Sequence, residues 1–119
     1  MAFVRACALA DVREDEGLAV TIDRYDVVIA RSGDEAFALQ DLCTHAAVPL
    51  SEGEVACDDG TCTIECWLHG STFDVRTGKP LIPPATEPVA TFPVEIRHDD
   101  GAAWVYVDVD STLNGVTPT

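Results

Sequence analysis

Two short clusters contain the residue types that bind transition metals. Cys43 and His45 are separated by one residue, and Cys66 and His69 are separated by two. Each cluster offers one thiolate and one imidazole, so together they offer four ligands. Such a set can hold a zinc ion or a binuclear iron–sulfur cluster, and the residue types alone leave both possibilities open.

The way the ligands are divided favours the iron–sulfur cluster. Zinc modules usually take two cysteines from one turn and two histidines from a helix, whereas each cluster here supplies one residue of each type. A two-iron cluster can place both sulfur ligands on one iron and both imidazoles on the other. A structural zinc module that mediates binding remains the alternative.

The elements that must position these residues are short strands. No segment has a sustained apolar period of 3.6 residues, and β-branched runs alternate with turn residues such as Asp58 and Gly60. The pattern predicts an all-β fold, an antiparallel sandwich or barrel, in one domain over residues 1–109 with a polar tail at 110–119. Strands are expected at residues 3–9, 18–22, 25–30, 35–40, 54–57, 61–65, 71–76, 92–97 and 103–109.

A proline-rich segment follows the second cluster. Residues 81–88 contain Pro83, Pro84 and Pro88. Because proline has no backbone N–H for a strand ladder, this segment cannot be an interior strand. We expect a stiff, extended loop that lies against another part of the chain.

The two clusters and their surroundings resemble the Rieske-type [2Fe–2S] motif. The resemblance runs from about Ala36 to Val94, and it includes the strand that begins at Ser71 and the proline loop around Pro84. It implies a Rieske fold with a cluster-binding subdomain of two loops at about 41–88, and one [2Fe–2S] cluster per chain. The ligands that it implies are Cys43, His45, Cys66 and His69.

The resemblance also implies roles for residues beside the ligands. Ser71 matches a serine that hydrogen-bonds the cluster in related proteins, and Pro84 matches the loop that covers the cluster. Trp67 lies between Cys66 and His69, and we expect it to shield the cluster from water, since the shell around a cluster controls its dielectric.

The function implied is that of a one-electron carrier, not of an enzyme. A Rieske-type ferredoxin takes an electron from a reductase and passes it to an acceptor. The acceptor stays open between a ring-hydroxylating oxygenase and the iron–sulfur assembly system, and residues 62–70 and 84–89 are closer to the assembly-linked proteins. A small subunit of a nitrite-reductase-like enzyme is a further alternative. A terminal oxygenase is excluded, because only His98 remains for an iron site that needs two histidines.

Composition restricts the partners and the compartment. Seven Lys and Arg face 21 Asp and Glu, a formal charge of −14 that disfavours nucleic acid and anionic membranes. No small-molecule substrate is expected. No apolar run approaches the roughly 20 residues of a membrane span, and no export signal is recognisable, so a cytoplasmic protein is expected. Cys57 and Cys62 could pair across a hairpin, but a reducing compartment favours free thiols.

Overall fold

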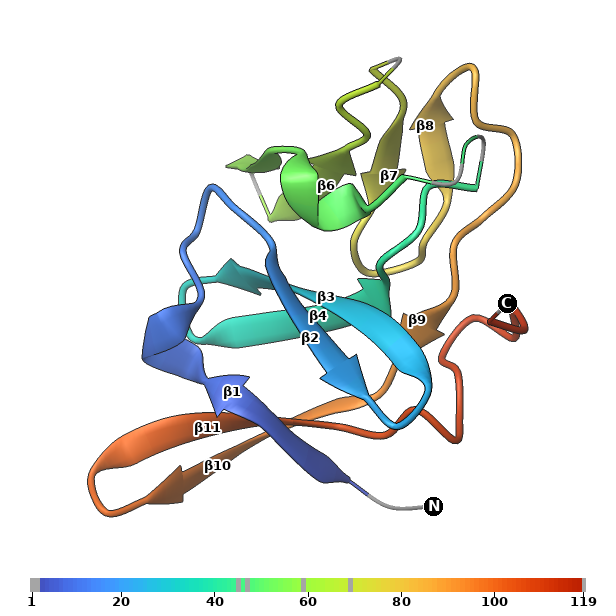
Figure 1. The fold of residues 1–119 in the computed structure, drawn as a ribbon. Helices are drawn as coiled ribbons and strands as arrows, with labels where there is room; N and C mark the ends of the chain where they lie inside the picture. Colours follow the sequence, from blue (N-terminus) through green and yellow to red (C-terminus); the bar gives the residue numbers. More distant parts are fainter. Residues whose placement is uncertain (1–2, 45, 47, 59, 69, 119) are drawn as a thin grey trace.

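The computed structural model describes residues 3–118, with residues 45, 47, 59 and 69 left out. The described part consists of eleven β-strands and two short 3-10 turns, η1 (Leu9–Asp11) and η2 (Leu50–Glu52), without an α-helix. The strands form three antiparallel sheets (Figure 1). The expected all-β class is confirmed. None of the described helical segments is long and apolar enough to cross a membrane.

Two of the sheets pack against each other and form the base of the molecule. One sheet has the order β1-β11-β10 and the other has the order β2-β3-β4-β9. Their inward side chains, including Val27, Phe92 and Val105, share one apolar core. The strands are β1 (Val4–Ala8), β2 (Leu18–Ile22), β3 (Tyr25–Ser32), β4 (Glu35–Gln40), β9 (Thr91–Phe92), β10 (Val94–Asp99) and β11 (Ala102–Val107).

The third sheet carries the second cysteine–histidine cluster. It has the order β5-β6-β7-β8, with β5 (Val55–Asp58), β6 (Thr61–Glu65), β7 (Thr72–Asp74) and β8 (Pro80–Ile82). It lies beyond the middle sheet, at the end of the molecule opposite β10 and β11 (Figure 1). A second apolar core joins it to the middle sheet through buried side chains such as Ile64, Phe73 and Leu39.

Prolines account for two differences from the expected strands. The strand expected at 92–97 is interrupted at Pro93, so that β9 pairs with β4 whereas β10 pairs with β11. Proline cannot donate a ladder hydrogen bond, and here the chain passes from one sheet to the other at this residue. The proline-rich segment expected to be only a loop begins with strand β8, which is allowed because β8 lies at the edge of its sheet.

The C-terminal segment folds back onto the domain. The N–H of Leu113 donates to the carbonyl of Thr91, and Val116 packs against the core of the two base sheets. Residues 110–118 therefore contact the chain close to where β9 begins.

The structure contains a disulfide where free thiols were expected. Cys57 and Cys62 lie directly opposite each other in β5 and β6, with 4.0 Å between their Cα atoms, and their sulfurs are bonded. The hairpin register brings the two side chains to the same face at close range, so the pairing across the hairpin that the sequence allowed is present and the expectation of free thiols is wrong.

Thiol counting tests this disulfide. Protein purified without reductant, then unfolded with its iron chelated, should expose three alkylatable cysteines, Cys7, Cys43 and Cys66. Prior reduction should raise the count to all five. Mass spectrometry of the peptides should show Cys57 linked to Cys62. Five alkylated cysteines without reduction would contradict the bond.

Candidate iron–sulfur site

The first ligand loop, residues 41–49, connects β4 to the turn η2. Its start is fixed by Asp41, whose two carboxylate oxygens accept hydrogen bonds from the N–H and the hydroxyl of Ser51 at 2.7 and 2.6 Å. Within the loop, the N–H of Cys43 donates to the carbonyl of Val48 at 2.9 Å. These bonds close the loop and turn the Cys43 side chain inward, where the residue is only 2% exposed.

The second ligand loop, residues 66–71, connects β6 to β7. The N–H of Cys66 donates to the carbonyl of Ser71 at 2.7 Å, and the N–H of Gly70 donates to the carbonyl of Cys66 at 3.0 Å. Gly70 has a φ of 76°, a conformation that glycine adopts without steric cost. The tight turn leaves Cys66 1% exposed, in the same apolar core as Cys43.

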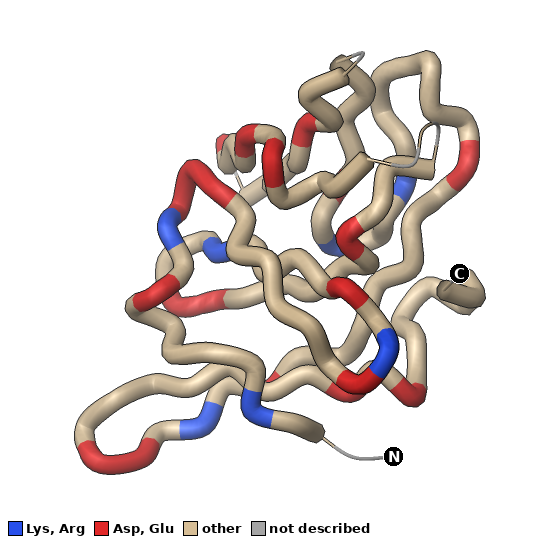
Figure 2. The backbone as a smooth tube through the Cα atoms, in the orientation of Figure 1, with Lys and Arg blue, Asp and Glu red and all other residues tan. Residues whose placement is uncertain are grey.

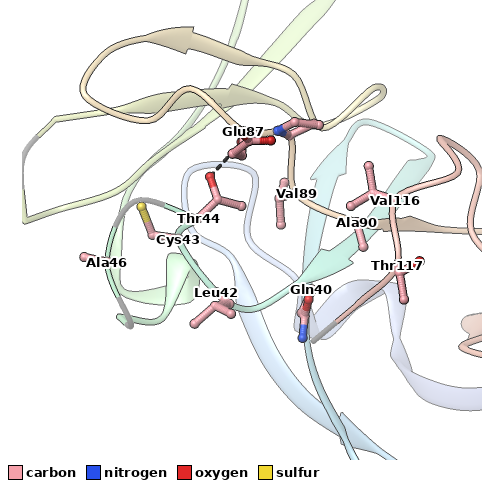
Figure 3. A pocket seen from close by; sticks show the side chains of 11 residues that line it. Gln40, Leu42, Cys43, Thr44, Ala46, Glu87, Val89, Ala90, Val116 and Thr117 are labelled. Carbon is pink, nitrogen blue, oxygen red and sulfur yellow. Dashed lines mark hydrogen bonds between the residues drawn. The ribbon is translucent and has the colours of Figure 1, made fainter.

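A third segment lies against both ligand loops. We call residues 79–88, which include β8, the cover segment. The N–H of Ala85 donates to the hydroxyl of fully buried Ser71 at 3.0 Å, and the hydroxyl of Thr44 donates to the carbonyl of Glu87 at 2.7 Å (Figure 3). One hydrogen bond therefore joins the cover segment to each ligand loop, as expected for a loop that lies against another part of the chain.

The backbones of the two ligand-bearing regions approach each other closely at Gly53. The N–H of Glu65 donates to the carbonyl of Glu54, so the residues after η2 run beside the end of β6. A Cβ built on Gly53 would overlap the carbonyl oxygen of Glu65 and lie 2.7 Å from its carbon. Only a residue without a side chain allows the two backbone segments to be this close. The contact is at Glu65, one residue before Cys66.

The predicted ligands divide into two groups. Cys43 and Cys66 share one buried core, and the disulfide uses neither of them. His45 and His69 lie outside the described residues. Within the remaining residues no group of three or more His, Cys, Asp or Glu could hold a metal. Two buried cysteines on adjacent loops supply the sulfur donors that one side of a binuclear cluster requires, so the residues present fit such a group.

The other predicted site residues differ in exposure. Ser71 is fully buried and contacts the cover segment, whereas Pro84 is exposed. Trp67 is 51% exposed and the neighbouring Leu68 is 39% exposed. About half of the Trp67 side chain therefore faces solvent, and its role as a shield stays a prediction.

Sequence reasoning did not identify three residues that shape the site. Asp41 and Thr44 are ordinary polar residues whose hydrogen-bond partners, Ser51 and Glu87, depend on how the loops fold. Gly53 is one of eight glycines, and nothing in the sequence distinguishes it from the other seven. A signal existed for Thr44 alone, because it stands between Cys43 and His45.

Removing the Thr44 hydroxyl should loosen the first ligand loop from the cover segment. We expect Thr44→Val to lower the free energy of unfolding by about 1 kcal/mol, the usual contribution of one hydrogen bond. Denaturant titration of the cluster-loaded protein measures this. Thr86→Val, at an exposed residue of the cover segment, is the control and should change little. Equal losses in both variants would show that the Thr44–Glu87 bond contributes nothing specific.

Comparison with known proteins agrees with this site. The model of the Rieske [2Fe–2S] domain family matches residues 2–93. The chain is 43% identical over 89 residues to the anthranilate 1,2-dioxygenase ferredoxin subunit of Burkholderia cepacia, covering 75% of this chain and 79% of that protein.

Solved structures agree as well. The ferredoxin of carbazole 1,9a-dioxygenase from Nocardioides aromaticivorans IC177 superposes with a TM-score of 0.76 at 32% identity, covering 88% of this chain and 97% of that one. The ferredoxin in a complex of reduced oxygenase and oxidized ferredoxin of carbazole 1,9a-dioxygenase gives 0.74 at 35% identity, covering 88% and 91%.

These matches decide between the two metal chemistries that the residue types left open. The matched region contains both cysteine–histidine clusters, and the relatives are ferredoxins. The cofactor is a [2Fe–2S] cluster rather than a zinc ion, and the protein transfers electrons instead of catalysing a reaction of its own. The chain belongs to the Rieske [2Fe–2S] domain family.

Proposed function

We propose that this protein is the ferredoxin component of a ring-hydroxylating dioxygenase system. It takes single electrons from a reductase and delivers them to the oxygenase, in the cytoplasm. The observation that supports this most strongly is the pair of buried cysteines, Cys43 and Cys66, on two loops bridged by one cover segment. The dioxygenase ferredoxins named above favour this acceptor over the iron–sulfur assembly system, which the sequence had slightly favoured.

The cluster would be held by Cys43, His45, Cys66 and His69, within a domain over residues 1–109 whose cluster-binding part spans about 41–88. When bound, it accepts and releases one electron. The chain's own residues keep that site rigid. Asp41 fixes the first loop through Ser51, and the Ser71 hydroxyl fixes the cover segment through Ala85. The apolar residues around the cysteines exclude water from the sulfur side of the site.

The partner should bind at the loops that enclose the cluster. Trp67 and Leu68 on the second ligand loop and Leu81 and Ile82 on the cover segment are all substantially exposed, the last two at 51%. Figure 2 shows acidic residues along all three sheets, so an apolar surface at these loops stands out from a largely acidic chain. Apolar residues on two loops bonded to each other form a surface suited to brief contact with another protein.

Reconstitution tests the proposed function. The cluster-loaded protein, a flavoprotein reductase and the oxygenase component of an anthranilate or carbazole dioxygenase should together hydroxylate the aromatic substrate. Omission of the protein should abolish turnover. If the reduced protein passes no electrons to such oxygenases but reduces iron–sulfur assembly proteins, the second acceptor is the correct one.

Truncating Trp67 should weaken partner binding. We expect Trp67→Ala to raise the KM for the ferredoxin in the oxygenase reaction about tenfold, because exposed aromatic residues often contribute more than 1 kcal/mol to an interface. The iron content of the variant should stay normal, so that the change in KM reports on binding and not on loss of the cluster. Val4→Ala, at an exposed apolar residue of β1 in the opposite sheet, is the control. A KM equal to that of the parent protein would place the partner elsewhere.

A further inference from the structure

One side chain of the C-terminal segment contacts both ends of the cover segment. The amide nitrogen Nδ2 of Asn114 donates to the carbonyl of Thr77 at 2.9 Å and to the carbonyl of Val89 at 2.8 Å. Thr77 lies just before the cover segment and Val89 lies just after it. A single amide group therefore bridges the residues that flank the cover segment on either side.

The other atom of the same amide holds Asn114 in place. Its Oδ1 accepts hydrogen bonds from the N–H groups of Thr91 and Val116, both at 3.3 Å. The N–H of the preceding Leu113 donates to the carbonyl of Thr91 at 2.8 Å. The nitrogen and the oxygen of the amide thus each make two hydrogen bonds. These four bonds to backbone groups fix the orientation of the side chain.

The two ends that Asn114 bridges are also packed tightly against each other. The N–H of Val89 donates to the carbonyl of Gly78 at 2.9 Å. Gly78 has a φ of +75°, and a Cβ built on it would overlap the carbonyl oxygen of Val89 and lie 2.8 Å from Nδ2 of Asn114. We call residues 77–78 and 89, which flank the cover segment, its neck. Where Gly78 meets Val89 beside Asn114, there is no room for a side chain.

The cover segment connects Asn114 to the two ligand loops. Its hydrogen bonds with the ligand loops, Ala85 to Ser71 and Glu87 to Thr44, lie three residues and one residue before its end at residue 88. Val116 and Thr117 also line a cavity of about 420 Å³ together with Cys43 and Thr44 (Figure 3). The C-terminal segment therefore borders the first ligand loop as well as the neck of the cover segment.

We propose that Asn114 is a positioning residue that closes the cover segment over the iron–sulfur site. Its amide joins the two ends of the segment, and the segment in turn holds Ser71 and Thr44. Without this amide the neck can separate, the bonds to the ligand loops open more often, and water reaches the cysteines. This role depends on the cluster site alone and not on which protein accepts the electron.

Hydrogen–deuterium exchange on the cluster-loaded protein tests the proposal. Asn114→Leu keeps a side chain of similar size and removes all four hydrogen bonds. We expect exchange in peptides from residues 79–88 to accelerate about tenfold or more, with peptides from β10 and β11 unchanged. The visible absorbance of the cluster should also decay several-fold faster in air.

Two further variants make the result interpretable. Leu113→Ala, at a side chain that is 65% exposed, should behave like the parent protein. Asn114→Asp retains both acceptor bonds to Oδ1 and loses both donor bonds to the neck, so it should reproduce the local effect even if the leucine variant does not fold.

Acceleration in every sheet alike, or unchanged exchange at residues 79–88 in Asn114→Asp, would overturn the proposal. Neither measurement needs an oxygenase or a reductase, so its failure is distinguishable from failure of the proposed function.

Discussion

Replacing Cys66 with serine should give a folded protein without a [2Fe–2S] cluster. Cys66 directly follows strand β6 and is buried in the same core as Cys43. Cys7 packs against the other core, and Cys57 and Cys62 are joined in a disulfide, so no other cysteine is free to take its place. Serine removes one of the two thiolates that would bind iron in the proposed site. We expect iron and acid-labile sulfide to fall by more than tenfold, together with loss of the visible absorbance and of the electron paramagnetic resonance signal of the reduced protein.

Cys7→Ser is the matched control. Cys7 lies in β1, and burial, with a smaller contribution from Asp11, raises the pKa of its thiol to about 11. Cys7 packs against the core of the two base sheets, whereas Cys43 and Cys66 lie in the other core, so this thiol is separate from the proposed site. This variant should retain a full cluster. A Cys66→Ser protein with the iron content of the control would contradict the ligand assignment and the reading of the whole site.

Substituting alanine for Gly53 should strongly destabilise the protein. The new Cβ would overlap the backbone carbonyl of Glu65, which cannot rotate away as a side chain can. Either β6 moves or the turn after η2 moves, and both carry ligand loops. We expect a loss of more than about 3 kcal/mol in the free energy of unfolding and a fall in the melting temperature of roughly 10 °C or more.

Gly101→Ala separates this clash from the general cost of replacing a glycine. Gly101 has a φ of +76°, but a Cβ there would meet nothing within 4 Å. Its alanine variant should lose only about 1 kcal/mol, the cost of an alanine in the left-handed region. Thermal unfolding followed by circular dichroism compares the two. Equal destabilisation would show that the approach of Gly53 to Glu65 is not needed.

Most strands were predictable because their signals are local. The β-branched runs of β2 and β3 and the polar turns between them are properties of neighbouring residues, and the structure places them close to where the pattern did. The interruption at Pro93 and the edge strand β8 were not predicted. Proline indicates where a ladder is weakened, but it does not say which sheet the chain joins next.

The sequence by itself determined the fold class and indicated the family, whereas its residue types left the choice of cofactor to the comparison with known proteins. Cys43 and Cys66, each followed closely by a histidine, form a pattern in which residue type and spacing are the signal. Only the tertiary structure decided how the site is held. The bond of Thr44 to Glu87, the approach of Gly53 to Glu65 and the bonds of Asn114 to Thr77, Val89 and Thr91 depend on contacts between separate parts of the folded chain. Such contacts leave no periodicity in the sequence, because their geometry arises only when the three sheets pack together.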